Sequence, residues 1–154
     1  MNKLKYLILF LFLIIIYCGD SDRITYPSPE GIPHIVNINS NELVMEASLN
    51  RDFMPACPPN GRPLSTVINI SDIHSLPISD SVRVDSLWVI NGIQVWATIL
   101  EEYSREDNGS TIIAGNATGP KWEPESRANV IVKVTAFENS YYFKAENVII
   151  GSSY

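Results

Sequence analysis

Two histidines are the first side chains whose chemistry could form a catalytic or metal site. His34 and His74 lie forty residues apart; His34 falls in the linker and His74 lies beside the Ser- and Asp-rich end of a strand, and neither has a second ligand at metal spacing. Catalytic triads and metal sites require several such groups to converge on one point. We therefore expect both histidines to have structural positions, and we predict neither a catalytic nor a metal-binding residue.

Four carboxylates lie close together at Glu101, Glu102, Glu106 and Asp107. A pair of carboxylates could hydrolyse a glycosidic bond, and several carboxylate oxygens could hold calcium. The segment contains no D-x-D-x-D-G calcium loop. We interpret these residues as a solvated loop, and we expect no hydrolase, no metal and no cofactor.

The two cysteines offer a different chemistry, because Cys18 follows a long apolar run. Residues 7–16 are all apolar, and Lys3 and Lys5 precede them without an acidic residue. A basic start followed by an apolar run of this length is typical of a secretory signal peptide. The alternative is an uncleaved membrane anchor, although a helix needs about 20 apolar residues to cross a bilayer.

Residues 15–18, Ile-Ile-Tyr-Cys, resemble the lipobox of bacterial lipoproteins. The resemblance implies that residues 1–17 are a cleaved signal peptide and that Cys18 carries a diacylglycerol. Tyr17 departs from the Gly, Ala or Ser that usually precedes the cysteine. Gly19 resembles the outer-membrane sorting pattern, which implies a lipid-anchored place on the outer membrane of the cell envelope. Two or three acyl chains make such an attachment effectively permanent.

Lipidation of Cys18 leaves Cys57 as the remaining thiol, which is either buried or available for an intermolecular disulfide. The sequence has no CxxC motif and no Cys/His cluster, so zinc and thioredoxin-like chemistry have no support. Residues 51–55, 87–92 and 119–122 also resemble segments of small uncharacterised envelope lipoproteins. That second resemblance implies no activity.

The composition places a large share of the hydrophobicity in the signal sequence. The chain has 154 residues and is 45% apolar, yet 15 of its first 18 residues are apolar. The remaining 136 residues are about 40% apolar, which suits one domain with a single core. They carry 17 acidic and nine basic residues, and this net charge of −8 excludes a basic nucleic-acid-binding protein.

Alternating apolar residues predict an all-β domain at 35–154, after an extended, proline-containing linker at 18–34. No segment after the signal has the period of a helix longer than two turns. Six or seven short strands are typical of a single antiparallel β-sandwich, immunoglobulin-like or fibronectin-III-like. The expected strands are residues 42–50, 64–73, 82–90, 93–100, 129–138 and 141–150, with an edge strand at 110–114.

The dipeptide Asn91-Gly92 between two β-branched runs predicts a type I′ hairpin. Such a turn places Leu87 opposite Trp96, and both then lie on one face of the hairpin. We expect the other face to cover the core. Its residues are Trp88, Ile90, Ile93, Val95 and Ile99.

The dipeptide Asn139-Ser140 predicts a second hairpin near the end of the sequence. A two-residue loop at this position places Ala136 opposite Phe143. It also places Lys133 opposite Glu146, and opposite charges at facing positions favour this pairing.

Trp96 is then expected on an apolar face of the first hairpin that the core does not cover. Either the proline-rich residues 50–63 or residues 119–124 lie over this face, or the face is exposed to a partner. We predict partner contacts at Trp96, Trp122 and Phe53. We interpret the chain as a non-enzymatic, membrane-tethered envelope lipoprotein that binds another envelope protein or a glycan. The alternative function is a carbohydrate-binding accessory module of the envelope.

Overall fold

The computed structural model describes residues 26–154, so the signal sequence, Cys18 and the first part of the linker lie outside the described residues. The described part is mostly β-strand with almost no helix, which confirms the all-β prediction. A short 3-10 helix lies at Asp107–Gly109. The strands are β1 (Ile35–Ile38), β2 (Asn41–Asp52), β3 (Ser65–Asp72), β4 (Arg83–Asn91), β5 (Gln94–Ile99), β6 (Glu101–Glu106), β7 (Thr111–Asn116), β8 (Arg127–Ala136) and β9 (Asn139–Ser153).

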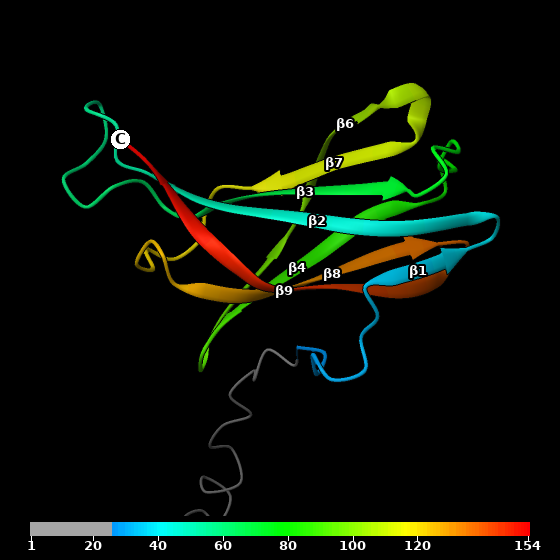
Figure 1. The fold of residues 1–154 in the computed structure, drawn as a ribbon, viewed down its shortest axis with the longest axis horizontal. Helices are drawn as coiled ribbons and strands as arrows, with labels where there is room; N and C mark the ends of the chain where they lie inside the picture. Colours follow the sequence, from blue (N-terminus) through cyan, green and yellow to red (C-terminus); the bar gives the residue numbers. More distant parts are fainter. Residues whose placement is uncertain (1–25) are drawn as a thin grey trace, which may run out of the picture.

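The strands form one sheet that bends around a core and nearly closes on itself (Figure 1). Their order is β5-β4-β8-β9-β2-β3-β7-β6, and β1 pairs with the start of β2. β9 joins the two halves, because it pairs antiparallel with β8 and its end pairs parallel with β2. On the other side, β5 continues into β6 after a single residue, Leu100. Where a strand or a short connection passes from one half of the sheet to the other, the sheet turns a corner, and the two halves close around the core.

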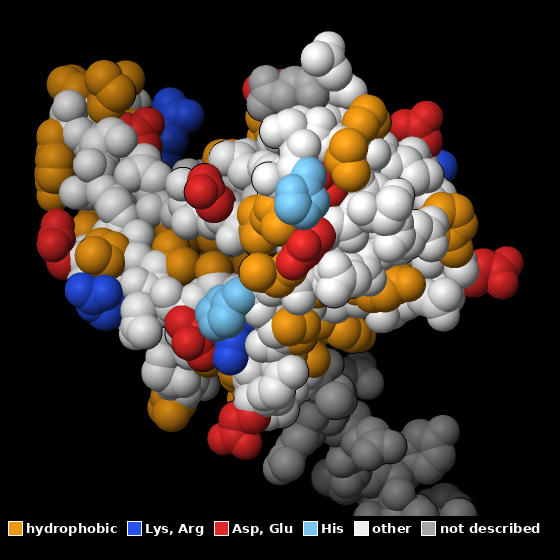
Figure 2. All heavy atoms as spheres, turned by 45° about the vertical axis from the view of Figure 1, so that its right-hand side comes forward, with side chains coloured by type: hydrophobic (Ala, Val, Ile, Leu, Met, Phe, Trp, Pro, Cys, Tyr) orange, Lys and Arg blue, Asp and Glu red, His pale blue; other side chains and the backbone are white. Residues whose placement is uncertain are grey.

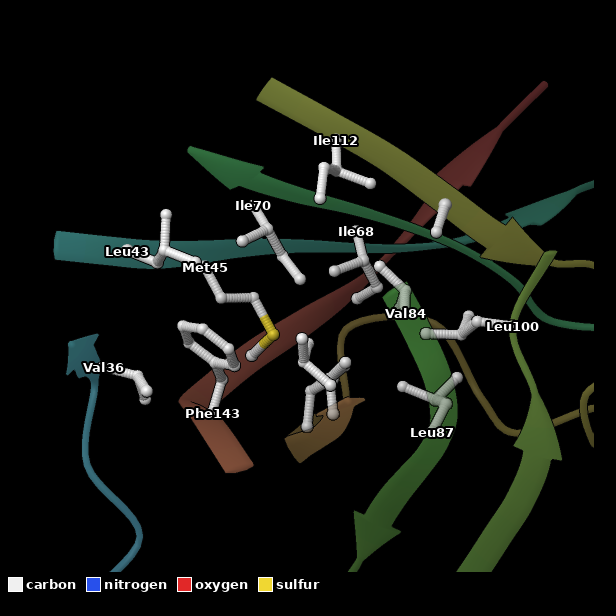
Figure 3. Close-up of a cluster of buried hydrophobic side chains, with 14 of the residues drawn as sticks. Val36, Leu43, Met45, Ile68, Ile70, Val84, Leu87, Leu100, Ile112 and Phe143 are labelled. Carbon is white, nitrogen blue, oxygen red and sulfur yellow. The ribbon is translucent and has the colours of Figure 1, made fainter. Parts of the chain in front are cut away.

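The core lies between the two halves of the sheet, where alternate residues of each strand point inward. Leu43 and Met45 of β2 face Phe143 of β9, with Ile68 and Ile70 of β3 beside them (Figure 3). Every second residue of a strand reaches the same face. The alternation at 42–50 therefore identified the inward residues of β2 correctly.

The first hairpin forms, but its turn and its inward face differ from the prediction. The turn residues are Gly92 and Ile93, and Val89 instead of Leu87 lies opposite Trp96. Gly92 alone has a positive φ, of 60°, which defines a type II′ turn with glycine first. The I′ prediction placed the turn one residue too early.

The inward face of this hairpin carries Leu87, Val89 and Trp96, all buried, whereas Ile93 is fully exposed. The prediction that the face of Trp88 covers the core is wrong. The reason lies in the neighbouring strand: β8 pairs with β4 and turns its valines inward, so β4 must turn Leu87 and Val89 inward with them.

The second hairpin also forms with a shifted turn. Its turn residues are Phe137 and Glu138, both with positive φ (48° and 69°), and Val132 lies opposite Phe143. Lys133 therefore does not meet Glu146. Its ammonium instead pairs with the carboxylate of Asp85 across the sheet, at 2.7 Å.

The segment predicted as a loop with one edge strand contains two strands. β6 holds Glu101, Glu102 and Glu106 on a strand at the sheet edge, and β7 lies inside the sheet between β3 and β6. Ile112 and Ala114 of β7 are both fully buried and lie on the face that meets the core.

Candidate functional site

One end of the molecule is built from a proline-rich loop at 53–64, the connection at 117–126, and the last residue, Tyr154; we call it the loop end. In Figure 1 it lies on the left, at the ends of β2 and β9. The amide of Phe53 donates to the carbonyl of Ser153 at 2.8 Å, so the start of the loop is fixed to the end of β9.

Arg51 joins the two segments of the loop end. Its side chain is only 3% exposed, and its guanidinium donates to three backbone carbonyls. These are Arg62 O (3.1 Å from Nε), Trp122 O (3.0 Å from Nη1) and Asn60 O (bonded by Nη2). Within the described part of the chain, no carboxylate forms an ion pair with Arg51. The planar guanidinium has five N–H donors and can therefore bond three separate carbonyls, whereas the ammonium of a lysine could not reproduce this geometry.

Two aromatic rings stack above this arginine. The rings of Phe53 and Tyr154 are nearly parallel, with centroids 5.5 Å apart, and the guanidinium of Arg51 lies 4.7 Å from the Phe53 centroid. Tyr154 is 83% exposed. Gly61 lies against Phe53, and a Cβ there would be 2.6 Å from the ring while φ is +69°, so only glycine fits. Arg51 and Gly61 therefore hold the Phe53 side of the stack, and the Tyr154 side faces solvent.

A hollow of about 490 Å³ lies beside the stack. Asp52 and Arg62 face each other across part of it at 3.5 Å. The amide of Met54 donates to Asp52 at 2.9 Å, and together with the Cys57 thiol and the Arg62 charge it holds the pKa of Asp52 below its ordinary value. The residues lining the hollow are Asn50, Asp52, Met54, Arg62, Pro63, Ser65, Ala117 and Ser153.

The three predicted contact residues have different places in the structure. Trp96 is only 9% exposed and lies in the core, where a Cβ on Gly119 would be 2.9 Å from its ring. Trp122 is half-buried and packs against the core. Phe53 is half-buried in the stack. The loop end thus brings Phe53 and Trp122 together, while Trp96 presents no surface to a partner.

Sequence reasoning missed Arg51 and Tyr154. A signal for Arg51 was present, because position 51 continues the inward phase of Leu43, Met45 and Leu49. A charged residue in an inward phase must find partners inside the fold. Nothing in the sequence indicated that Tyr154 stacks on a residue 101 positions earlier.

The opposite end is organised by a second buried charge, Asp72, which is 4% exposed. Its Oδ1 accepts from the amides of His74 and Leu76, both at 2.9 Å. Its Oδ2 accepts from the Glu42 amide and the Asn41 side chain, both at 3.0 Å. Burial by itself raises the pKa of Asp72, but the four hydrogen bonds outweigh it, and the pKa lies below its ordinary value.

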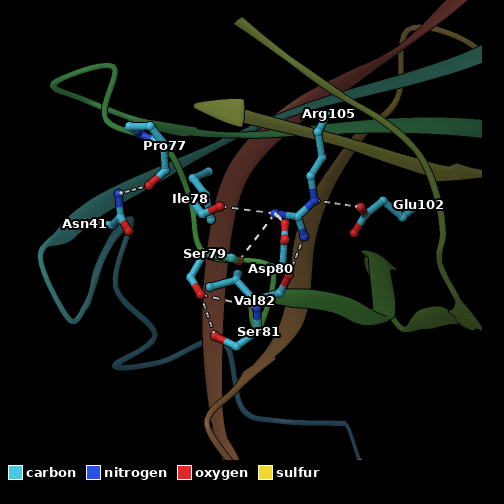
Figure 4. Close-up of polar contacts among 9 residues, drawn as sticks. All are labelled: Asn41, Pro77, Ile78, Ser79, Asp80, Ser81, Val82, Glu102 and Arg105. Carbon is cyan, nitrogen blue, oxygen red and sulfur yellow. Dashed lines mark hydrogen bonds and ion pairs between the residues drawn. The ribbon is translucent and has the colours of Figure 1, made fainter. Parts of the chain in front are cut away.

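Within the acidic cluster, the structure gives Glu102 a structural partner. Glu102 pairs with Arg105 at 2.9 Å, and Arg105 also donates to the carbonyls of Ile78, Ser79 and Val82 (Figure 4). Asp80 lies 3.7 Å from the same guanidinium. Arg105 therefore fastens the 77–82 segment to β6, and Glu102 has a structural partner.

Both histidines lie on the face shown in Figure 2, each beside an acidic side chain. His34 is 3.9 Å from Glu146, and His74 is 3.6 Å from Glu42. In residues 26–154, no group of three or more His, Cys, Asp or Glu side chains is placed to hold a metal ion. The same residues include no helix long and apolar enough to cross a membrane.

No protein-family model matches the chain, no curated protein matches it, and no solved structure matches it.

Proposed function

We propose that the chain is a non-enzymatic, lipid-anchored protein of the bacterial cell envelope, which binds a partner and does not transform a substrate. The tether is Cys18, whose lipobox-like surroundings support cleavage after residue 17 and attachment to the outer membrane. The 18–34 segment links the anchor to the domain.

We further propose an immunoglobulin-like topology for the domain. The strand order supports it, since an immunoglobulin sandwich has strands A, B, E and D in one sheet and C, F and G in the other. Lettered along the chain, β2, β3, β7 and β6 take the places A, B, E and D, and β5, β4, β8 and β9 take C′, C, F and G. Trp88 on β4 departs from the buried tryptophan of that family. Nuclear Overhauser contacts between Asn50 and Gly151 test the parallel β2–β9 pairing, and their absence would contradict it.

The proposed contact surface is the loop end, and the exposed Phe53–Tyr154 stack is the observation that carries this proposal. Aromatic anchors on rigid supports dominate binding energies at protein interfaces, because little conformational freedom is lost on binding. Here Arg51 and Gly61 fix the inner ring, and the outer ring faces solvent.

The chemistry around the stack favours a protein partner. Met54 is 51% exposed beside the rings, and Asp52 and Arg62 form a polar border. A mixture of aromatic, aliphatic and polar side chains is typical of a protein interface. A carbohydrate-binding module, our alternative, favours a flat row of aromatic rings for stacking on sugars.

Replacement of both stacked residues, Phe53→Ala with Tyr154→Ala, tests the contact surface. We expect capture of a specific envelope protein from detergent-solubilised membranes to fall by about tenfold or more, as for a truncated hot spot. Ile73→Ala is the control, because Ile73 is an exposed apolar residue next to the far end of β3, away from the loop end. Unchanged capture by the double variant, with unchanged binding to a glycan array, would contradict the proposal. Loss of glycan binding alone would favour the carbohydrate alternative.

A further inference from the structure

The two edge strands of the sheet differ in their protection against pairing with another strand. β6 carries four charged residues among six, and its pairing with β7 has a register shift. β5, with the sequence Gln-Val-Trp-Ala-Thr-Ile, has no charge, no proline and no register shift against β4. Natural proteins use charges, prolines and bulges to block unwanted edge pairing. By this criterion β6 is a blocked edge and β5 is open as far as Ala97, whereas the carbonyl of Ile99 at its end accepts from the side chain of Asn116 at 3.1 Å.

The backbone of β5 offers hydrogen-bonding groups at this edge. The amide of Leu100 donates to the carbonyl of Asp85 at 2.9 Å, so the backbone at position 100 faces β4. Since facing alternates along an antiparallel strand, Trp96 and Thr98 also face β4, and Val95 and Ala97 face away from it. Within residues 26–154, the outward backbone groups of Val95 and Ala97 have no hydrogen-bond partner.

The residues at 93–99 are symmetric in type about Trp96. Ile93 matches Ile99, Gln94 matches Thr98, and Val95 matches Ala97. The two isoleucines are also the most exposed aliphatic side chains of the described domain, with Ile93 fully exposed and Ile99 71% exposed. A two-fold antiparallel pair centred on Trp96 would place each Ile93, the turn residue directly before β5, next to Ile99 of the other copy.

We propose that β5 pairs antiparallel with β5 of a second copy of this chain, centred on Trp96. A two-fold interface requires a surface that is complementary to itself, and the symmetric sequence meets that requirement. Two copies of a chain with a net charge of −6 repel each other, and β5 is an uncharged segment at which they can meet. Val95 of each copy then exchanges two backbone hydrogen bonds with Ala97 of the other. This pairing does not depend on the function proposed for the loop end.

Disulfide crosslinking of the full-length chain in membranes tests the pairing and its register. The variant carries Ile93→Cys and Ile99→Cys in a Cys57→Ser background and is oxidised with copper phenanthroline. The extended strand from position 94 to position 99 spans about 17 Å, and position 93 lies directly before it, so a disulfide within one chain is impossible. We expect a dimer band on a non-reducing gel, at least about tenfold stronger than with either single cysteine, because only the double variant places a cysteine of each copy beside a cysteine of the other.

Two further substitutions in that variant block the pairing in different ways. Ala97→Pro removes an outward N–H without removing a hydrogen bond to β4, and Ala97→Lys adds a charge to the edge. Both should abolish the dimer band, whereas Ile149→Lys, on an exposed position of β9, should keep it. A double-cysteine band no stronger than the single-cysteine bands would overturn the proposal. So would a band that survives both Ala97 substitutions.

Discussion

Replacing Arg51 with methionine is expected to lower the free energy of unfolding by about 3–5 kcal/mol. The substitution keeps most of the apolar stem but leaves the carbonyls of Asn60, Arg62 and Trp122 without their donor. Each unsatisfied buried carbonyl costs about 1–3 kcal/mol. Arg51→Lys should recover only part of the loss, because an ammonium cannot match a planar fork. Urea unfolding of the purified variants measures both values.

The position of Arg51 also predicts which segments of the Arg51→Met variant lose their structure first. Without the guanidinium, the 53–64 loop and the 117–126 connection lose their common partner, so we expect protease cleavage in these segments before global unfolding. Arg83, an exposed arginine at the start of β4, provides the matched control. Arg83→Met should change stability by less than about 0.5 kcal/mol. Equal stability losses for Arg51→Met and Arg83→Met would show that Arg51 does not hold the loop end together.

Replacing Asp72 with alanine is expected to lower the free energy of unfolding at pH 7 by about 2–4 kcal/mol. Four donors converge on this carboxylate, and three of them are backbone amides of residues 42, 74 and 76. Asp72→Asn should also destabilise the fold, because its amide nitrogen would replace an acceptor oxygen with a further donor. Chemical denaturation at pH 7 measures these losses.

The effect of Asp72 should depend on pH in a defined direction. Its folded-state pKa lies below the ordinary value, so its contribution is fully present above that ordinary value and disappears as pH falls through the folded pKa. The stability difference between wild type and Asp72→Ala should therefore shrink as the solution is acidified below the ordinary aspartate pKa. Asp80→Ala is the control, because the Asp80 side chain is fully exposed. A difference that stays constant on acidification would show that the charged form of Asp72 is not what stabilises this end.

The sequence predicted the strands well because alternation is a local property. In β2, Leu43, Met45 and Leu49 all point inward as the pattern required. The exact turn positions were not predictable from the turn dipeptides, because the core decides the register. Phe137 and Glu138 occupy a turn that their residue types do not favour, since non-glycine residues pay a cost for positive φ.

The face of a hairpin and the members of a site were harder to predict, because both depend on distant segments. The more apolar face of the first hairpin, that of Trp88, lies outside the core, where Trp88 contacts Tyr142 of β9 at a ring distance of 6.3 Å. In the same way, Phe53 was identified from its proline-rich loop, but its partner Tyr154 comes from the far end of the chain. The local sequence pattern shows that residues of a strand alternate between two faces, but only the tertiary fold decides which of the two faces is buried.

The membrane tether is the central claim of this account, and the mass of the mature protein purified from membranes tests it most directly. We predict an N-terminal peptide that begins at Cys18 and carries a diacylglyceryl thioether, with residues 1–17 removed. Cys57, which is half-buried beside Arg62, should carry no lipid. An unacylated Cys18 on a chain that still begins at Met1 would contradict the tether and the envelope location derived from it.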